Sequence, residues 1–192
     1  MSQEINLDRS RFFGAAAGTL AAAQSFLGSS AGAQSGNAKP VSAIEPGTHT
    51  SFPVLKQINA GVLNVGYAEA GPADGPPVIL LHGWPYDIHA LVDVAPILAS
   101  AGFRVIVPHL RGYGTTRFLS AQALRNGQQG ALAVDVIDLL DALRIEKAVI
   151  GFDWGARTGK YARRLITGGI GHNLPQEAPQ AFAEAVIDVA GY

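Results

Sequence analysis

The chain has 192 residues, enough for one domain with a sizeable core; 48% of them are hydrophobic and 15% are charged. This composition excludes a disordered chain, and a net charge of −1 gives no electrostatic footprint for nucleic acid or an anionic membrane. The absence of cysteine excludes disulfides, thiolate chemistry and cysteine-ligated metal, and we expect no metal or cofactor.

The first 33 residues are typical of a bacterial export signal. Arg9 and Arg11 precede an apolar, Ala-rich run over residues 12–27, and residues 31–33 (Ala-Gly-Ala) offer the small side chains that a signal peptidase needs. The block around the arginines is similar to a twin-arginine signal, although Ser10 separates them, so the Sec route stays open. The alternative is a membrane-anchored or amphipathic helix, but the run falls short of the ~20 strongly hydrophobic residues of a span.

These features predict three parts of the chain. Residues 1–33 are a cleaved signal, residues 34–53 are a linker, and residues 54–192 are the folded domain. We therefore expect an exported protein, periplasmic or secreted, with no stable membrane insertion after cleavage.

From residue 54 onward, short β-rich runs alternate with helical stretches. The predicted strands are residues 62–68, 78–81, 103–107 and 148–150. The first alternates apolar and polar residues, which favours an antiparallel or edge strand, whereas the others are apolar enough to be buried on both faces. The predicted helices are residues 90–101, 131–143 and 178–189. This order predicts an α/β fold with a mostly parallel sheet, flanking helices and a ligand site beyond the carboxyl ends of the strands.

The helix predicted at residues 131–143 has the clearest pattern. Its expected buried face carries Leu132, Val136, Leu139, Leu140 and Leu143. Its expected polar face carries Asp135, Asp138 and Asp141.

Residues 151–155, of sequence GFDWG, directly follow the strand at residues 148–150. The glycines two positions either side of Asp153 permit a sharp strand-to-helix turn that lifts this side chain above the sheet at a helix N-terminus. A carboxylate there is ionised at neutral pH and can displace at an sp³ carbon, such as that of an epoxide or a carbon–halogen bond, to form an ester. The alternative is an aspartate that only caps the helix.

A second motif, residues 82–85 (HGWP), follows the strand at residues 78–81. The backbone N–H groups of Trp84 and Trp154 are expected to form an oxyanion hole for hydrolysis of the ester. His82 is expected to be structural and to bond loop backbone. A third loop, residues 111–116 (RGYGTT), belongs to the same edge of the sheet, although alone it would be an ordinary Gly-rich connection.

In this order and spacing, the three motifs resemble the epoxide hydrolase and haloalkane dehalogenase branch of the α/β-hydrolase superfamily. The resemblance covers roughly residues 62–157 and resumes around residues 168–189. It implies a small apolar organic substrate. Trp84 favours an epoxide hydrolase, because dehalogenases usually carry a polar residue after the His-Gly pair; a haloalkane dehalogenase is the alternative. No pattern predicts the oligomeric state.

The resemblance also implies roles for individual residues. Asp153 matches the nucleophile, and Trp84 and Trp154 match the oxyanion-hole positions. Trp154 also matches the indole that binds the leaving halide in dehalogenases. His172 matches the general base that activates the water for ester hydrolysis; its alternative role is a loop histidine with a structural bond.

The pattern breaks between the nucleophile and the base. Only 18 residues separate Asp153 from His172, whereas the family places two further strands with their helices, a helical cap and the triad acid in this interval. Glu177 and Asp188, beyond the histidine, match nothing in the pattern. We therefore expect an internally truncated α/β-hydrolase domain that lacks the cap and two late core strands, and a catalytically inactive remnant is a further alternative. Loss of the acid partner costs about 10⁴ in rate in the serine triad.

Overall fold

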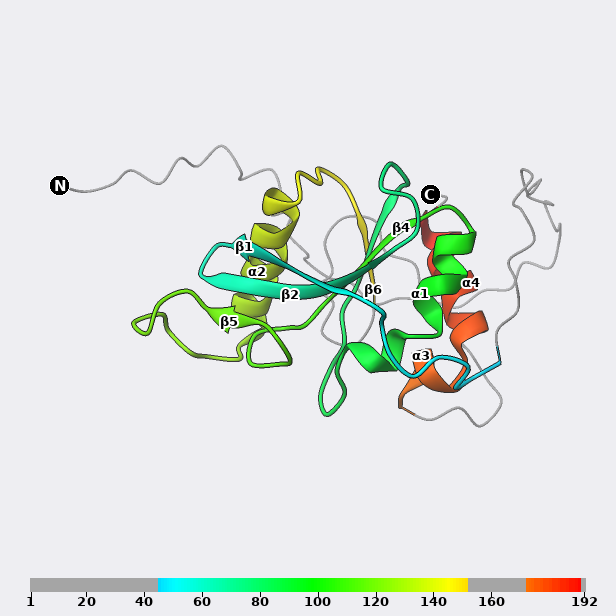
Figure 1. The fold of residues 1–192 in the computed structure, drawn as a ribbon, viewed down its shortest axis with the longest axis horizontal. Coiled ribbons are helices and arrows are strands. Elements are labelled where there is room, and N and C mark those ends of the chain that lie inside the picture. Colours follow the sequence, from blue (N-terminus) through cyan, green and yellow to red (C-terminus); the bar gives the residue numbers. More distant parts are fainter. Residues whose placement is uncertain (1–44, 152–171, 191–192) are drawn as a thin grey trace, which may run out of the picture. The chain divides into compact units, whose positions relative to one another are not determined.

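The computed structural model describes residues 45–151 and 172–190 (Figure 1). The predicted export signal lies outside these ranges, as do Asp153 and Trp154. Within the described ranges, no helix has the length and apolar character needed to cross a membrane.

The described strands form one mixed sheet in the order β1-β2-β4-β3-β6, with β5 paired to β2. The strands are β1 (Leu55–Ala60), β2 (Leu63–Ala70), β3 (Pro77–Leu80), β4 (Arg104–Pro108), β5 (Arg117–Phe118) and β6 (Val149–Gly151). Strand β2 runs antiparallel to β1, β4 and β5, while β3 runs parallel to β4 and β6. The α/β prediction is confirmed, but the described sheet is mixed rather than mostly parallel. Among its described pairings only those of β3 with β4 and β6 are parallel, because β1, β2 and β5 add antiparallel pairs.

The antiparallel part follows from a hairpin that the sequence pattern only half predicted. The run at residues 62–68 is β2, and its antiparallel pairing was expected. Its partner β1 was not predicted, because β1 is mostly exposed and has no apolar run. A tight turn joins the two strands through Gly61, which has a φ of +53°. Such a turn can connect only antiparallel strands.

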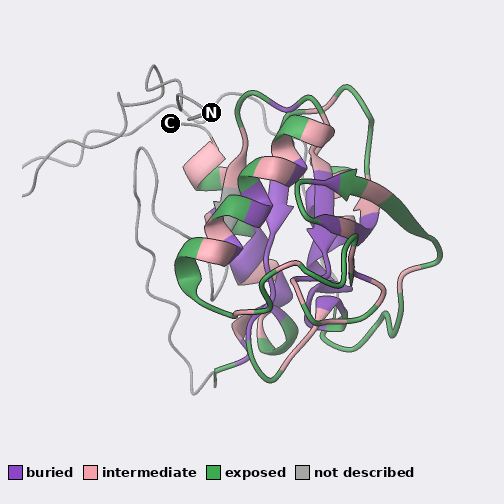
Figure 2. Ribbon diagram, turned by 90° about the vertical axis from the view of Figure 1, so that its left-hand side faces the viewer, coloured by how far each residue is buried: buried purple, intermediate pink, exposed green. Residues whose placement is uncertain are grey.

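Helices cover both faces of the sheet. They are the 3₁₀ helix η2 (Ile88–Leu91) and the α-helices α1 (Val94–Ser100), α2 (Gln129–Ala142), α3 (Leu174–Glu177) and α4 (Pro179–Ala190). One core cluster joins α1 and α4 to alternate strand residues, including Val78, Leu80, Val105 and Val107. A second joins α2 to the intervening residues, including Ile79, Leu81 and Ile106, and a third, smaller cluster joins Leu139 of α2 to Ala60, Leu63 and Val65. The buried residues therefore follow the central strands (Figure 2), as strands covered on both faces require.

The four-residue α3 was not predicted, and two further details differ from the predicted helices. The helix expected at residues 90–101 is divided into η2 and α1, with Asp93 at the start of α1. The Asp87 carboxylate accepts the His89 N–H at 2.9 Å and so begins η2 two residues earlier. In α2, Asp135 was expected on the polar face but is buried, because it pairs with Arg111.

Part of the predicted linker contacts the domain. Residues 45–53 contain neither helix nor strand, and their backbone is bound to the buried carboxylate of Asp93. The N–H groups of Gly47 and His49 donate to this carboxylate at 2.6 and 2.8 Å, and His49 Nδ1 lies 2.9 Å from it. Phe52 also packs against the core cluster of α1 and α4. The boundary at residue 53 stays a prediction.

Candidate active site

Three strands, β3, β4 and β6, end at one edge of the sheet. Strand β3 pairs in parallel with both β4 and β6, and Leu80 lies opposite Gly151. The carboxyl ends of parallel strands meet at the same edge. The loop of residues 82–87 therefore starts beside the end of β6, and Asp153 follows that end by two positions in the sequence.

His82 anchors the loop after β3 to the loop after β4. It is fully buried, and its Nε2 accepts the backbone N–H of Leu110 at 3.1 Å. Because Nε2 is an acceptor, the ring proton lies on Nδ1, which is 3.5 Å from the Gly83 carbonyl oxygen. The ring also makes an edge contact with Tyr113 at 4.6 Å between centroids. The predicted structural role of His82 is confirmed.

Trp84 lies on this anchored loop. Its side chain is 70% exposed, and the peptide bond between Trp84 and Pro85 is cis. The indole is therefore open to solvent at the carboxyl edge of the sheet. The predicted role of the Trp84 N–H in an oxyanion hole stays a prediction, since its proposed partner Trp154 lies outside the described residues.

His172 lies against the same loop. Its exposed ring is 6.1 Å from the Tyr86 ring, centroid to centroid, with the planes 31° apart. The residue after it, Asn173, is buried, and its carbonyl oxygen accepts the N–H groups of Gln176 and Glu177 at 3.0 Å. This turn begins α3, which packs against η2. The structure thus brings His172 to the loop that carries Trp84.

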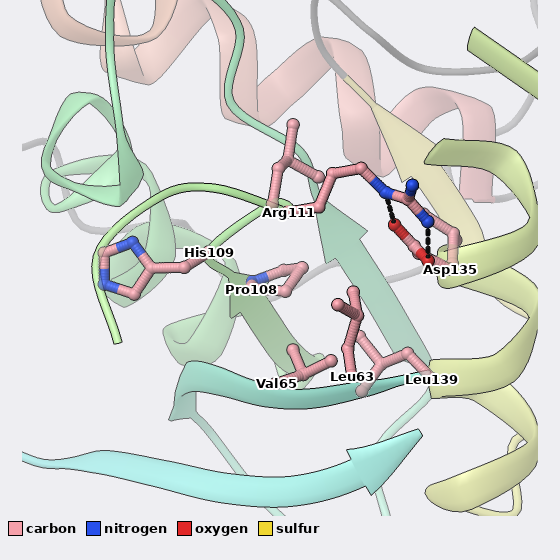
Figure 3. Close-up of a pocket in the computed structure, with 9 residues that line it drawn as sticks. Leu63, Val65, Pro108, His109, Arg111, Asp135 and Leu139 are labelled. Carbon is pink, nitrogen blue, oxygen red and sulfur yellow. Dashed lines mark hydrogen bonds and ion pairs between the residues drawn. The ribbon is translucent and has the colours of Figure 1, made fainter. Parts of the chain in front are cut away.

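The loop after β4 is fixed by a buried ion pair. Arg111 Nε and Nη2 donate to the two carboxylate oxygens of Asp135 at 2.5 and 2.6 Å, and both side chains are 8% exposed (Figure 3). Arg111 Nη1 also donates to the Asn126 carbonyl oxygen at 3.0 Å. Hydrogen bonding to Asp135 raises the pKa of Arg111 above its ordinary value. The pair borders a small pocket lined mainly by apolar side chains, including Leu63, Val65, Pro108, Val136 and Leu139.

His109 is a second buried histidine in this loop. Burial lowers the pKa of His109 below its ordinary value, and Nδ1 has no hydrogen-bond partner among the described residues. Gly114, with a φ of +47°, packs directly on the ring, and a Cβ there would lie 2.2 Å from Cε1. Within the described ranges, no group of three or more His, Asp or Glu residues is placed to bind a metal ion.

Known proteins are similar to this chain over these strands and loops. Residues 76–162 match the model of the α/β hydrolase fold family. Over this region the chain is similar to the α/β-hydrolase family. The match includes β3, β4 and β6 with their loops, and the predicted nucleophile turn.

The proteins similar to this chain include both predicted enzyme classes. Epoxide hydrolase A of Mycobacterium tuberculosis is 34% identical over 105 residues, which are 54% of this chain and 32% of the relative. The haloalkane dehalogenase of Mycobacterium marinum is 35% identical over 134 residues, which are 62% of this chain and 43% of the relative. The chain thus spans less than half the length of the curated relatives it matches.

A solved structure of a Klebsiella pneumoniae protein, assigned as an epoxide hydrolase, is 63% identical with a TM-score of 0.53. The likeness covers 54% of this chain and 35% of that protein. The predicted branch of the superfamily is therefore confirmed, and the partial coverage fits the predicted truncation. Tyr86 was not singled out from the sequence, although it directly follows the HGWP motif.

Proposed function

We propose that this α/β hydrolase opens epoxides through a covalent ester on Asp153. The observation that supports this most is the register of β3 and β6. It starts the Trp84 loop and the chain that leads to Asp153 at the same edge of the sheet. The contact of His172 with Tyr86 adds a histidine to the same loop.

In the proposed reaction, a carboxylate oxygen of Asp153 attacks a ring carbon of the epoxide. A new C–O bond forms as the ring C–O bond breaks, and the ring oxygen keeps the electron pair and takes a proton from solvent. His172 then takes a proton from a water molecule whose oxygen attacks the ester carbonyl carbon. The N–H groups of Trp84 and Trp154 stabilise the resulting oxyanion. The acyl C–O bond breaks, the proton passes from His172 to the departing alkoxide, and a diol is released.

Haloalkane hydrolysis by the same nucleophile is a second candidate, supported by the Mycobacterium marinum relative. In that reaction the carbon–halogen bond breaks and the halide leaves with the electron pair. Faster release of halide from a haloalkane than of diol from an epoxide would favour this candidate. An inactive remnant would release neither product.

The first prediction concerns the route of the oxygen atom. With enzyme in excess over styrene oxide in ¹⁸O water, a single turnover should give unlabelled diol, and the peptide that contains Asp153 should gain one ¹⁸O. This follows because the diol oxygen comes from the carboxylate, which water then refills. Mass spectrometry of product and peptide measures both.

Asp153→Asn should abolish this turnover, whereas Asp141→Asn, at an exposed position of α2, should keep it. Circular dichroism of both variants controls for folding. Labelled diol with an unlabelled Asp153 peptide would show direct attack by water and would overturn the proposal. Absence of turnover by the folded chain with epoxides and haloalkanes would favour the remnant.

A further inference from the structure

We propose that Tyr86 is the positioning residue for His172, so that its ring sets the orientation of the imidazole that drives ester hydrolysis. This inference rests on the proposed function for its catalytic consequence. The ring contact between Tyr86 and His172, which orients the imidazole, involves described residues alone.

The loop that carries Tyr86 is fixed on both sides. Upstream, His82 is buried and bound to the Leu110 N–H at 3.1 Å. Downstream, the Asp87 carboxylate accepts the His89 N–H at 2.9 Å, which fixes the start of η2. Tyr86 lies between these two anchors and is half-buried. It can therefore serve as a rigid surface for a neighbouring ring.

His172 is fixed through its backbone more than through burial of its ring. Asn173 is buried and begins the turn of α3, and Pro175 is buried as well. The imidazole itself is exposed, so burial alone does not select its rotamer. A separation of 6.1 Å between ring centroids is within the range of aromatic pairs. The Tyr86 ring thus restricts rotamers that the backbone of His172 leaves open.

Restriction of the imidazole matters for catalysis because a general base must lie within hydrogen-bond reach of the water that it activates. A displacement of about 1 Å can slow a reaction about 100-fold. Only the step that uses His172 should respond to Tyr86. Alkylation of Asp153 precedes that step and does not need the base.

The kinetic test compares Tyr86→Leu, which removes the aromatic ring, with Tyr86→Phe, which keeps it. In single-turnover experiments with styrene oxide, Tyr86→Leu should slow ester hydrolysis by about 10–100-fold and leave alkylation within about twofold. Tyr86→Phe should keep both rates within about twofold. Leu124→Ala, at a residue that is 77% exposed and outside the site, is the control. Equal slowing in Tyr86→Phe and Tyr86→Leu would assign the effect to the hydroxyl group and overturn the proposal.

Nuclear magnetic resonance tests the ring contact without any reaction. The unaltered chain should show cross-relaxation between ring protons of Tyr86 and His172, with His172→Gln used to assign the histidine signals. The His172 signals should move in Tyr86→Leu and stay nearly in place in Tyr86→Phe. If the unaltered chain shows no such cross-relaxation, the positioning role is wrong. If it does, while no ester forms on Asp153, the proposed function fails and the ring contact stands.

Discussion

The rings of His82 and His109 lie 6.4 Å apart, but their polar surroundings differ. His82 Nε2 accepts a backbone N–H, whereas His109 Nδ1 has no hydrogen-bond partner among the described residues. Burial lowers the pKa of His109; the nearby Asp87 opposes this shift, while His82, His89 and Arg117 reinforce it. His109 is therefore neutral in the folded chain over a range of pH where an unfolded chain would bind a proton.

This difference predicts how stability depends on pH. The folded chain binds fewer protons at His109 than the unfolded chain does. The contribution of the neutral His109 ring to the free energy of unfolding is therefore fully present above the unfolded pKa of about 6.5, and it decreases as pH falls below that value. His109→Gln should therefore lose less stability between pH 8 and pH 5 than the unaltered chain. Urea denaturation at the two pH values measures this. Leu124→Ala, at a residue that is 77% exposed and carries no titrating group, should keep the pH dependence of the unaltered chain. An unchanged dependence in His109→Gln would contradict the prediction.

Single residues of the site were predictable only where a local motif marks them. Trp84 follows a buried strand within a recognisable loop, and the structural role of His82 follows from the same motif. The contact between Tyr86 and His172 joins residues far apart in the sequence. Local periodicity cannot predict such a contact, because the contact depends on how α3 packs against η2.

At the scale of elements, α2 shows what hydrophobic periodicity predicts and what it leaves out. The helix was expected over residues 131–143 and spans Gln129–Ala142. Of its expected apolar face, Leu132, Val136 and Leu139 are buried, whereas Leu140 and Leu143 are only partly buried. Asp135 shares that buried environment because Arg111, from the loop after β4, neutralises it. A periodicity argument places every charge outward, since it does not include a partner from another element.

The ion pair predicts a large effect of one substitution. Asp135→Ala should lower the free energy of unfolding by about 3–5 kcal/mol, because it leaves the buried Arg111 guanidinium without its counter-charge. Urea denaturation followed by circular dichroism measures the loss. Asp141→Ala, at an exposed position of the same helix, should change stability by less than about 0.5 kcal/mol.

Replacing both Arg111 and Asp135 separates the effect of the buried charges on stability from the effect of side-chain packing. The double variant Arg111→Met and Asp135→Leu should lose less stability than Asp135→Ala, because no unpaired charge stays buried. Equal losses in Asp135→Ala and Asp141→Ala would mean that the pair contributes little.

Local sequence signals also explain which elements were found. Strands β3, β4 and β6 are short apolar runs, and the prediction placed each within one residue of its observed position. The prediction missed β1, whose side chains are mostly exposed, as well as the two-residue β5 and the four-residue α3, and it joined η2 to α1. The errors at β1 and η2 arise because hydrophobicity reports burial, whereas a hairpin turn and a capping carboxylate are specified by backbone hydrogen bonds.

At the scale of the whole molecule, the chain carries the first part of an α/β-hydrolase fold and matches about a third of the Klebsiella pneumoniae structure. The family was predictable because three motifs follow consecutive predicted strands. The substrate was not, because the cap that would select it has no counterpart in the sequence pattern.

The predicted export signal also concerns the whole chain. We propose that residues 1–33 are removed on export, so the mature protein should begin at Gln34. Expression in a bacterial host, fractionation and intact-protein mass spectrometry measure this. Ala33→Leu should block cleavage, and replacing Arg9 and Arg11 by lysine should reduce export if the twin-arginine route is used. An uncleaved chain confined to the cytoplasm would contradict export.

Packing in the cluster of α1 and α4 and in the cluster of α2 also constrains the register of β6 in the sheet. Val149 packs with the cluster of α1 and α4, while Ala148 packs with the cluster of α2 on the opposite face. A slip of β6 by one residue would exchange these faces and put a small side chain where valine fills the core. It would also shift the chain that leads to Asp153 by about 3.3 Å, several times the error that a reacting group tolerates. Ordinary hydrophobic packing therefore sets where β6 ends, two residues before the proposed nucleophile in the sequence.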